Sequence, residues 1–437
     1  MAFSANRAKH GDRAVVETHP LRPVRLAYFV SHPIQYQSPL LRRIAAQPEI
    51  ELTVFFGSDF SVKGYADQGF GVEVEWDVPL LEGYRHEFLP NLRDQRTGSG
   101  FSAISYGLTQ RLLSPDGTPA FDALWVHGYA SANSLHAMLV ARSLGIPVLL
   151  RAESWLRDRQ RSGAKLAIKH ASFSLLKRLV SATLPIGTLN AEYWTHYLGP
   201  ECPQFLMPYA VDNEYFQQRS QAAQSGRTEL QRELALDPAR PVILFASKLQ
   251  TRKHCADLVA AYLQLRPAAG QDPEPYLVIV GDGEERASLE RQVAESGVTS
   301  VRFCGFRNQS ELPRFFDLAS IFVLPSRHEA WGLIVNEVMN AACAVIITDD
   351  CGCQPDLVTD GVEGWVYPVR DVDALAAALR RVLATPETAA TMGQNALARI
   401  NKWSFEEDID GLRRALAHVT RRQRTCATSP QNVEVHP

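Results

Sequence analysis

Two glutamates, Glu329 and Glu337, lie on either side of a short glycine-containing turn. The apolar run at residues 321–324 precedes them and predicts a buried strand, and a helix is expected to start near Leu333. Open α/β sheets bind ligands at the carboxyl ends of their parallel strands, which is where this turn falls. Backbone N–H groups at a helix start favour phosphate, and carboxylates accept hydrogen bonds from sugar hydroxyls. The pattern suits a sugar attached to a phosphate, although a loop acid beside a solvated helix acid would give the same spacing.

Two lysines, Lys248 and Lys253, follow a second apolar run at residues 241–246. This run also predicts a buried strand, so the lysines fall at its carboxyl end. Two cations there can bind a diphosphate and neutralise the charge that builds on a leaving nucleoside diphosphate. Arg252 stands between them and adds a third positive charge. A solvated basic loop is the alternative interpretation.

Between about residues 240 and 385, short motifs follow one another in a fixed order. In that order they resemble the retaining glycosyltransferases of the GT4 family, the glycosyl transferases group 1. The resemblance implies a GT-B fold, which is α/β and has two Rossmann-like doubly wound domains that face each other across a cleft. The motifs are Lys248-Leu249 followed by Lys253, Gly281-Asp282-Gly283, Phe303-Cys304-Gly305, Leu324-Pro325-Ser326, Glu329-x-Trp-Gly-Leu, Glu337-Val-Met, Gly364 and the segment 371–383.

The resemblance also implies roles for residues of the second domain. Glu329 is expected to contact hydroxyls of the transferred sugar, and Glu337 is expected to hold the ribose diol. The other expected donor contacts are Lys248, Lys253, Gly332 and Leu333 for the diphosphate, and Gly281, Phe306 and Arg307 for the nucleobase region.

In the first domain, polar residues stand where predicted strands end. His127 ends one such strand and, by the resemblance, faces the donor sugar; a packed core histidine is the alternative. Arg151 and Glu153 end the next strand and are cleft candidates, although they could simply pair with each other. His32 and Gln35 lie in the first loop, where many relatives carry a glycine pair, so we expect side chains to contact acceptor or donor there. Either residue could instead mark the entry to a helix.

The expected domain organisation follows from these strands and from changes in composition. A long segment at residues 57–100, rich in glycine and aromatic residues, interrupts the first domain and is assigned to acceptor selection. The expected parts are a disordered extension at 1–23, a first, acceptor-side domain at 24–212 with a returning helix at 404–419, a linker at 213–239, a nucleotide-sugar-binding domain at 240–403 and a disordered tail at 420–437.

The composition is that of an ordinary globular enzyme. The 437 residues are 46% hydrophobic and 21% charged, with a net charge of −3, which gives no reason to expect nucleic-acid binding. The seven cysteines are scattered, so we expect reduced thiols in a cytoplasmic protein; a metal site at Cys351-Gly352-Cys353 is the alternative. No apolar run reaches the ~18 residues of a membrane span.

A basic and apolar stretch at residues 164–180 has helical spacing. Such a helix can lie on an anionic membrane surface, where many of the resembled enzymes meet lipid-linked acceptors, and this would place the protein at the inner face of the membrane. The alternative is an amphipathic helix that packs on the sheet.

These features predict an enzyme, a glycosyltransferase that moves a sugar from a UDP- or GDP-sugar to an acceptor with retention at the anomeric carbon. The acceptor would be a glycan, a lipid-linked molecule or a small molecule, and polysaccharide or glycolipid assembly is the expected role. Catalysis would rest on Glu329, His127 and Lys253, through positioning and electrostatics, with no cofactor and no metal ion. The alternatives are a nucleotide-sugar 2-epimerase of the same fold and a non-catalytic sugar-nucleotide binding protein.

Overall fold

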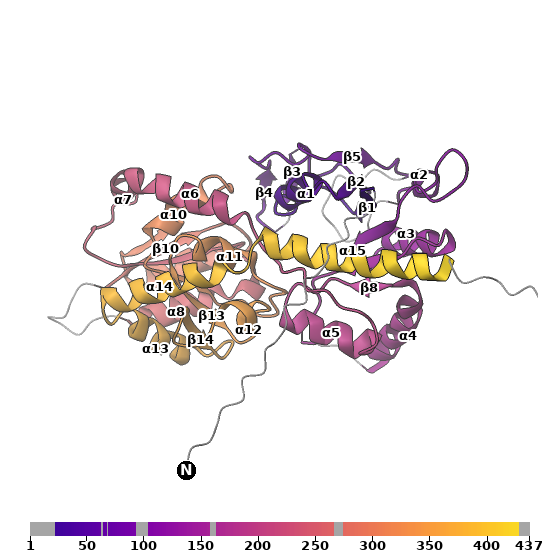
Figure 1. The fold of residues 1–437 in the computed structure, drawn as a ribbon. Helices are drawn as coiled ribbons and strands as arrows, with labels where there is room; N and C mark the ends of the chain where they lie inside the picture. Colours follow the sequence, from indigo (N-terminus) through magenta and orange to yellow (C-terminus); the bar gives the residue numbers. More distant parts are fainter. Residues whose placement is uncertain are drawn as a thin grey trace, which may run out of the picture.

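The computed structural model describes residues 22–62, 64–67, 69–92, 104–157, 163–265 and 274–427. Residues 1–21 and 428–437, most of the expected extension and part of the expected tail, therefore lie outside the described residues. Within the described part, the chain forms two six-stranded parallel sheets flanked by helices (Figure 1). The predicted α/β fold with two doubly wound sheets is confirmed.

The first sheet has the strand order β5-β2-β1-β6-β7-β8. Its central strands are apolar because helices cover both faces, as is usual for parallel sheets. Its strands are β1 (Val24–Val30), β2 (Ile50–Phe56), β5 (Arg85–Phe88), β6 (Ala123–His127), β7 (Val148–Arg151) and β8 (Ala182–Thr183), and its helices are α1 (Ser38–Ala45), α2 (Leu108–Arg111), α3 (Ala132–Ser143), α4 (Gly163–Leu179) and α5 (Thr188–Leu198).

The second sheet has the order β11-β10-β9-β12-β13-β14. The strand order reverses between β9 and β12, so the loops that follow these two strands open a crevice at their carboxyl ends. Its strands are β9 (Val242–Ala246), β10 (Tyr276–Val280), β11 (Val301–Phe303), β12 (Ile321–Leu324), β13 (Ala344–Thr348) and β14 (Gly364–Tyr367), and its helices are η2 (Thr251–Lys253), α8 (Cys255–Leu263), α9 (Arg286–Ser296), α10 (Leu312–Leu318), α11 (Leu333–Met339), α12 (Gln354–Leu357), α13 (Val372–Val382) and α14 (Pro386–Ile400).

The range expected to link the domains, 213–239, is largely helical. It contains α6 (Asn213–Ala223), η1 (Gln224–Gly226) and α7 (Arg227–Glu233). Phe216 of α6 is buried against Phe316 of α10, with the ring centroids 6.3 Å apart. The segment therefore packs on the second domain.

The last helix, α15 (Phe405–Ala427), returns to the first domain and runs along it, in yellow in Figure 1. Ile409, Leu412 and Leu416 of α15 are buried in the core of the first sheet. The helix continues to Ala427, so the expectation of a disordered tail from residue 420 is wrong for residues 420–427.

Arg151 is bound to α15 and does not reach the cleft. Its side chain is 1% exposed, and Nη2 donates to Asp408 Oδ1 at 3.1 Å and to the carbonyl oxygen atoms of Met207 and Pro208. The prediction that Arg151 is a cleft residue is therefore wrong. The side chain points from the end of β7 into the contact between the sheet and α15, where a buried cation needs a partner.

A small hairpin of β3 (Tyr65–Asp67) and β4 (Val72–Val74) lies within the glycine- and aromatic-rich segment that interrupts the first domain. Figure 1 shows it at the end of the first domain nearest the second domain. We call residues 65–67 and 69–77 the strap. The strap reaches the second domain, where Asp67 contacts Lys248.

Candidate functional site

A cavity of about 390 Å³ lies between the two domains, beside the carboxyl ends of β9 and β10. Its walls come from the strap and the first loop on one side and from the second domain on the other. Predicted site residues that line it are Gln35, Lys248, Lys253, Gly281, Phe306, Arg307 and Glu337.

Lys253 and Glu329 form a nearly buried ion pair beside this cavity. The Lys253 ammonium donates to Glu329 Oε2, and the two side chains are 9% and 11% exposed. Arg252 Nη1 lies 3.5 Å from the same oxygen atom. Burial raises the pKa of Glu329, but the charges of Lys253 and Arg252 lower it more, so the pKa lies below its ordinary value. Glu329 is therefore an ionised acid whose charge is matched by neighbouring cations.

Glu337, one turn into α11, lines the cavity in a different electrostatic state. Burial raises the pKa of Glu337 to about 8, and no cation among the described residues pairs with it. The carboxyl group is therefore largely protonated at pH 7. These two acids thus differ in charge, because within the described part of the chain cations pair with Glu329 and none pairs with Glu337.

Two glycines let the backbone approach the cavity closely. Gly281 follows β10 with a φ of +136°, and a Cβ atom there would lie 1.9 Å from the carbonyl oxygen of Ser247. Gly332 precedes Leu333, the first residue of α11, with a φ of +92°. Both positions therefore need glycine, since other residues rarely adopt a positive φ. The α11 helix starts beside the cavity, because its residues Ile334 and Glu337 line the wall.

Phe306 and Arg307 form the wall near β11. Arg307 is fixed by hydrogen bonds from Nη1 to Glu311 Oε1 at 3.2 Å and from Nε to the carbonyl oxygen of Cys304 at 3.2 Å. Phe306 contacts Phe70 of the strap edge to face, with the ring centroids 4.7 Å apart. This wall therefore offers an aromatic face and a positioned guanidinium group.

The strap, part of the segment assigned to acceptor selection, contributes one side of the site. Tyr65, Asp67, Phe70 and Trp76 line the cavity, and Asp67 accepts hydrogen bonds from the Lys248 ammonium at 2.8 Å on both carboxylate oxygens. The strap therefore faces the residues predicted to bind the donor. The only signal in the sequence was the long aromatic and glycine-rich segment, which we had assigned to the acceptor.

A polar cluster occupies the carboxyl ends of β6 and β7 in the first domain. Glu153 accepts hydrogen bonds from Tyr36, at 3.1 Å, and from Tyr209, and its Oε1 lies 3.5 Å from His127 Nε2. Gln37 Nε2 lies 3.1 Å from His127 Nδ1. Burial raises the pKa of Glu153, but His127 and the two tyrosines lower it below its ordinary value. The same Gln37 nitrogen lies 3.3 Å from His127 Nε2, so Glu153 and Gln37 both contact the His127 ring.

Tyr36, Gln37 and Tyr209 were not predicted as site residues. Tyr36 and Gln37 lie in the first loop that we had singled out, and Tyr209 lies in the segment that closes the first domain. Their hydroxyl and amide groups become functional candidates only when the fold brings them to Glu153 and His127.

The two predicted residues of the first loop lie in different places. Gln35 lines the interdomain cavity, whereas His32 packs on Phe60, with the ring centroids 4.4 Å apart, and contacts Ser31 Oγ at 2.8 Å. Burial, with a smaller contribution from His127, lowers the pKa of His32 to about 4. His32 is therefore a neutral ring, beside the cavity lining rather than part of it.

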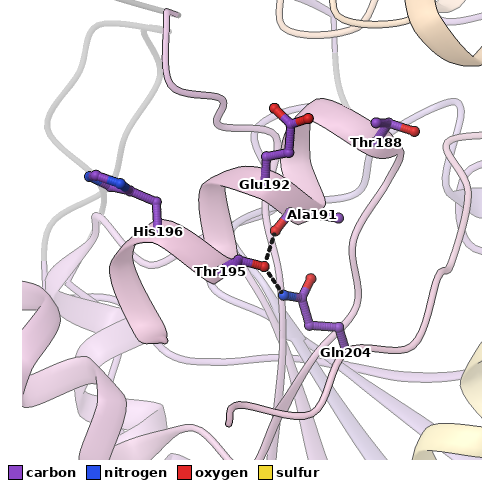
Figure 2. Close-up of a pocket in the computed structure, with 6 residues that line it drawn as sticks. All are labelled: Thr188, Ala191, Glu192, Thr195, His196 and Gln204. Carbon is purple, nitrogen blue, oxygen red and sulfur yellow. Dashed lines mark hydrogen bonds between the residues drawn. The ribbon is translucent and has the colours of Figure 1, made fainter. Parts of the chain in front are cut away.

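A second hollow, of about 580 Å³, lies along α5 and is shown in Figure 2. Gln204 Nε2 donates to Thr195 Oγ1 at 2.7 Å, which in turn donates to the carbonyl oxygen of Ala191 at 3.0 Å. Among the residues that the structure describes, no lysine or arginine lines this hollow, so these residues offer no ammonium or guanidinium group to a diphosphate. Its lining residues are Thr188, Ala191, Glu192, Thr195, His196 and Gln204.

Neither a metal cluster nor a membrane span is found in the described part of the chain. No group of three or more His, Cys, Asp or Glu side chains there is arranged to hold a metal ion. Cys351 and Cys353 are buried with their Sγ atoms 3.6 Å apart, and no described His, Cys, Asp or Glu completes a metal-binding group with them. Among the described helices, none combines the length and the apolar character needed to cross a bilayer.

Comparisons with known proteins match the second domain and the fold. Residues 226–399 fit the family described as "Glycosyl transferases group 1". An alpha-D-kanosaminyltransferase of Streptomyces kanamyceticus is 31% identical over 171 residues, 39% of this chain and 43% of that protein. A GDP-mannose-dependent alpha-(1-6)-phosphatidylinositol monomannoside mannosyltransferase of Mycolicibacterium smegmatis is 32% identical over 202 residues, 45% of this chain and 51% of that protein. The matches thus span about half the length of these relatives or less.

Solved structures resemble the whole chain. Anabaena Alr3699/HepE in complex with UDP superimposes with a TM-score of 0.67 at 16% identity, covering 90% of this chain and all of that one. Sucrose-phosphate synthase from Thermosynechococcus elongatus gives a TM-score of 0.62 at 19% identity, with 93% of this chain covered and 100% of that chain. At these identities the likeness shows the fold, which is GT-B. Residues 226–399, most of the second domain, thus match the glycosyl transferases group 1, in agreement with the resemblance seen in the sequence.

Proposed function

We propose that the protein is a retaining glycosyltransferase that transfers a sugar from a nucleoside diphosphate sugar to a glycan, lipid-linked or small-molecule acceptor. The observation that carries this proposal is the interdomain cavity, where Lys248, Lys253 and Glu337 converge beside Gly281. Cations suit the diphosphate, the carboxyl group suits the ribose diol, and a glycine permits close backbone approach. Relatives point the same way, since one is named GDP-mannose-dependent and a solved structure of similar fold contains UDP-glucose.

In the proposed reaction, the bond between the anomeric carbon and the diphosphate breaks while the acceptor oxygen attacks from the same face. Lys248 and Lys253 would stabilise the negative charge that builds on the leaving diphosphate. Glu329, beside Lys253, would hold the hydroxyls of the transferred sugar. The leaving phosphate would take the acceptor proton, so catalysis rests on positioning and electrostatics, without a protein nucleophile or a metal ion.

The first-domain cluster is proposed to hold the sugar and acceptor side of the site. His127 would face the donor sugar, in the orientation that Glu153 and Gln37 impose on its ring. Tyr36 and Tyr209 keep Glu153 ionised by donating hydrogen bonds to it. An ionised Glu153 favours the proton on the nitrogen of His127 that faces it.

A peripheral contact with an anionic membrane through α4 is proposed for an acceptor carried on lipid. Leu166, Ile168 and Leu175 of α4 are 36%, 68% and 44% exposed, and Lys165 and Arg178 are exposed on the same helix. Apolar residues beside cations favour the headgroup region of anionic lipid. The buried residues Phe173, Leu176 and Leu179 show that the same helix also packs on its domain. Under this proposal the protein works on the cytoplasmic side of the membrane.

The first experiment is thermal unfolding with UDP, GDP and their sugar conjugates, because a ligand that binds only the folded state raises the melting temperature. Wild type is compared with Lys253→Ala and Glu337→Ala. A rise with one nucleotide series that both substitutions abolish supports the proposal and fixes the donor class. No rise with any nucleotide would reject the donor site. Incubation of the bound nucleotide sugar without acceptor separates the alternatives, since an epimerised sugar would indicate a 2-epimerase.

A further inference from the structure

Lys248 is neutralised in the free protein by a residue of the other domain. The Asp67 carboxylate of the strap accepts from Lys248 Nζ with both oxygens at 2.8 Å, and the two side chains are 11% and 31% exposed. The backbone N–H groups of Gly69 and Phe70 donate to Asp67 Oδ1 at 2.8 and 3.0 Å. Burial raises the pKa of Asp67, but Lys248 and these N–H groups lower it below its ordinary value. The pair is therefore ionised, oriented and partly shielded from water.

The strap also makes direct contacts with the second domain on both sides of Asp67. The Lys248 ammonium lies 4.6 Å from the centre of the Phe70 ring, whose edge-to-face partner is Phe306. Asn308 Nδ2 donates to the carbonyl oxygen of Glu75 at 2.6 Å, and the Ser310 N–H group donates to Asp77 at 3.2 Å. The strap therefore crosses the opening between the domains and is held to the wall of the cavity.

A diphosphate at Lys248 and the Asp67 carboxylate in its present place would compete for one ammonium group. A bound diphosphate would also place negative charge beside Asp67, and like charges at such distances repel. We propose that Asp67 is a displaceable counter-ion of Lys248, so that a nucleoside diphosphate must separate the pair and loosen the strap from the second domain. This inference rests on the proposed donor site, and it assigns to the strap a role in donor affinity.

The strap carries aromatic side chains that can meet a nucleotide and one charged contact that an anion can replace. Tyr65, Phe70 and Trp76 line the same cavity as Lys248, so a base or ribose that enters the cavity meets the strap directly. Of these contacts to the second domain, only the pair of Asp67 with Lys248 joins two opposite charges, and therefore it is the one that an entering anion can exchange.

The test is the affinity for UDP and for GDP, measured by titration calorimetry. Asp67→Asn removes the charge but keeps an oxygen that can accept from Gly69 and Phe70, so the hairpin is preserved. We expect this variant to bind the nucleotide about five-fold more tightly, as expected when a partly exposed ion pair no longer has to be broken. Glu73→Gln, which neutralises an exposed carboxylate of the same strap on β4, is the matched control and should change affinity by less than about two-fold.

A Lys248→Ala background tests whether Asp67 acts through Lys248. There, Asp67→Asn should leave nucleotide affinity unchanged, whereas a general effect of charge on the cavity would persist. Unchanged or weaker binding by Asp67→Asn in the wild-type background would overturn the inference while leaving the donor site intact. Failure of every variant, wild type included, to bind either nucleotide would reject the proposed function and this inference with it. Melting curves of each variant without nucleotide verify that the fold is kept.

Discussion

The ion pair of Lys253 and Glu329 predicts a large and specific loss of stability in Lys253→Met. The substitution keeps the length of the side chain but leaves the Glu329 carboxylate, which is 11% exposed, without its main partner. Removing one member of a buried ion pair costs about 3–5 kcal/mol, because the remaining charge stays desolvated. Arg252 Nη1, 3.5 Å from the same carboxylate and half exposed, offsets part of this cost. We therefore expect the free energy of unfolding to fall by about 3 kcal/mol, near the lower end of that range.

Urea denaturation followed by circular dichroism measures this loss. The matched control is Lys253→Met combined with Glu329→Gln, which replaces the pair by neutral groups of similar size and should recover at least about half of the lost stability. A double variant as unstable as Lys253→Met alone would refute the reasoning, since the loss would then come from packing. Unchanged stability in Lys253→Met would show that Arg252 alone can balance Glu329.

Three other predictions follow from the same structure. The pKa of Glu337 is about 8 in the folded state, against an ordinary value of 4.5. Between these pH values the folded state keeps a proton that the unfolded state releases. The free energy of unfolding should therefore fall as the pH rises from 4.5 to about 8. Glu337→Gln should remove this slope in denaturation curves recorded across the window, and an unchanged slope would contradict it. Arg151→Met should destabilise the protein by about 3 kcal/mol in urea denaturation, because Asp408 is then buried without its cation. The same substitution should leave nucleotide affinity unaltered, since Arg151 does not line the cavity. EDTA should leave transferase activity intact, and an absolute requirement for Mg²⁺ or Mn²⁺ in the same assay would count against the metal-free mechanism.

The second half of the candidate site could be predicted because its residues lie in the loops and helices that follow recognisable strands. The apolar runs that became β9 and β12 fix where Lys248 and Glu329 stand along the chain. The rule that parallel strands present their carboxyl ends at one edge then brings these residues together. Short-range pattern and one topological rule were sufficient, and the predicted start of a helix near Leu333 agrees with α11.

The same rule failed for Arg151, because a position at a strand end does not determine where a long side chain points. Its partner, Asp408, lies 257 residues away in sequence, on a helix whose place against the sheet no local pattern reveals. The Asp67 contact to Lys248 spans 181 residues in the same way. Long-range ion pairs of this kind depend on how the domains and the last helix pack. Local patterns in a single sequence do not predict that packing.

The charges around the cavity explain why the strap, rather than the loop of Glu329, should yield to an incoming donor. Both lysines of the site are already neutralised, Lys253 by Glu329 and Lys248 by Asp67. The Glu329 backbone is fixed at both ends, since its N–H group donates to the Asp350 carbonyl oxygen at 3.2 Å and its carbonyl oxygen accepts from Gly352 at 2.9 Å. Asp67 instead belongs to a short two-stranded hairpin of the other domain. A diphosphate can therefore bind Lys248 by displacing the hairpin, whereas at Lys253 it must share an ammonium group that stays paired with Glu329. Because the hairpin belongs to the first domain, binding at Lys248 would also change how tightly the two domains are held together.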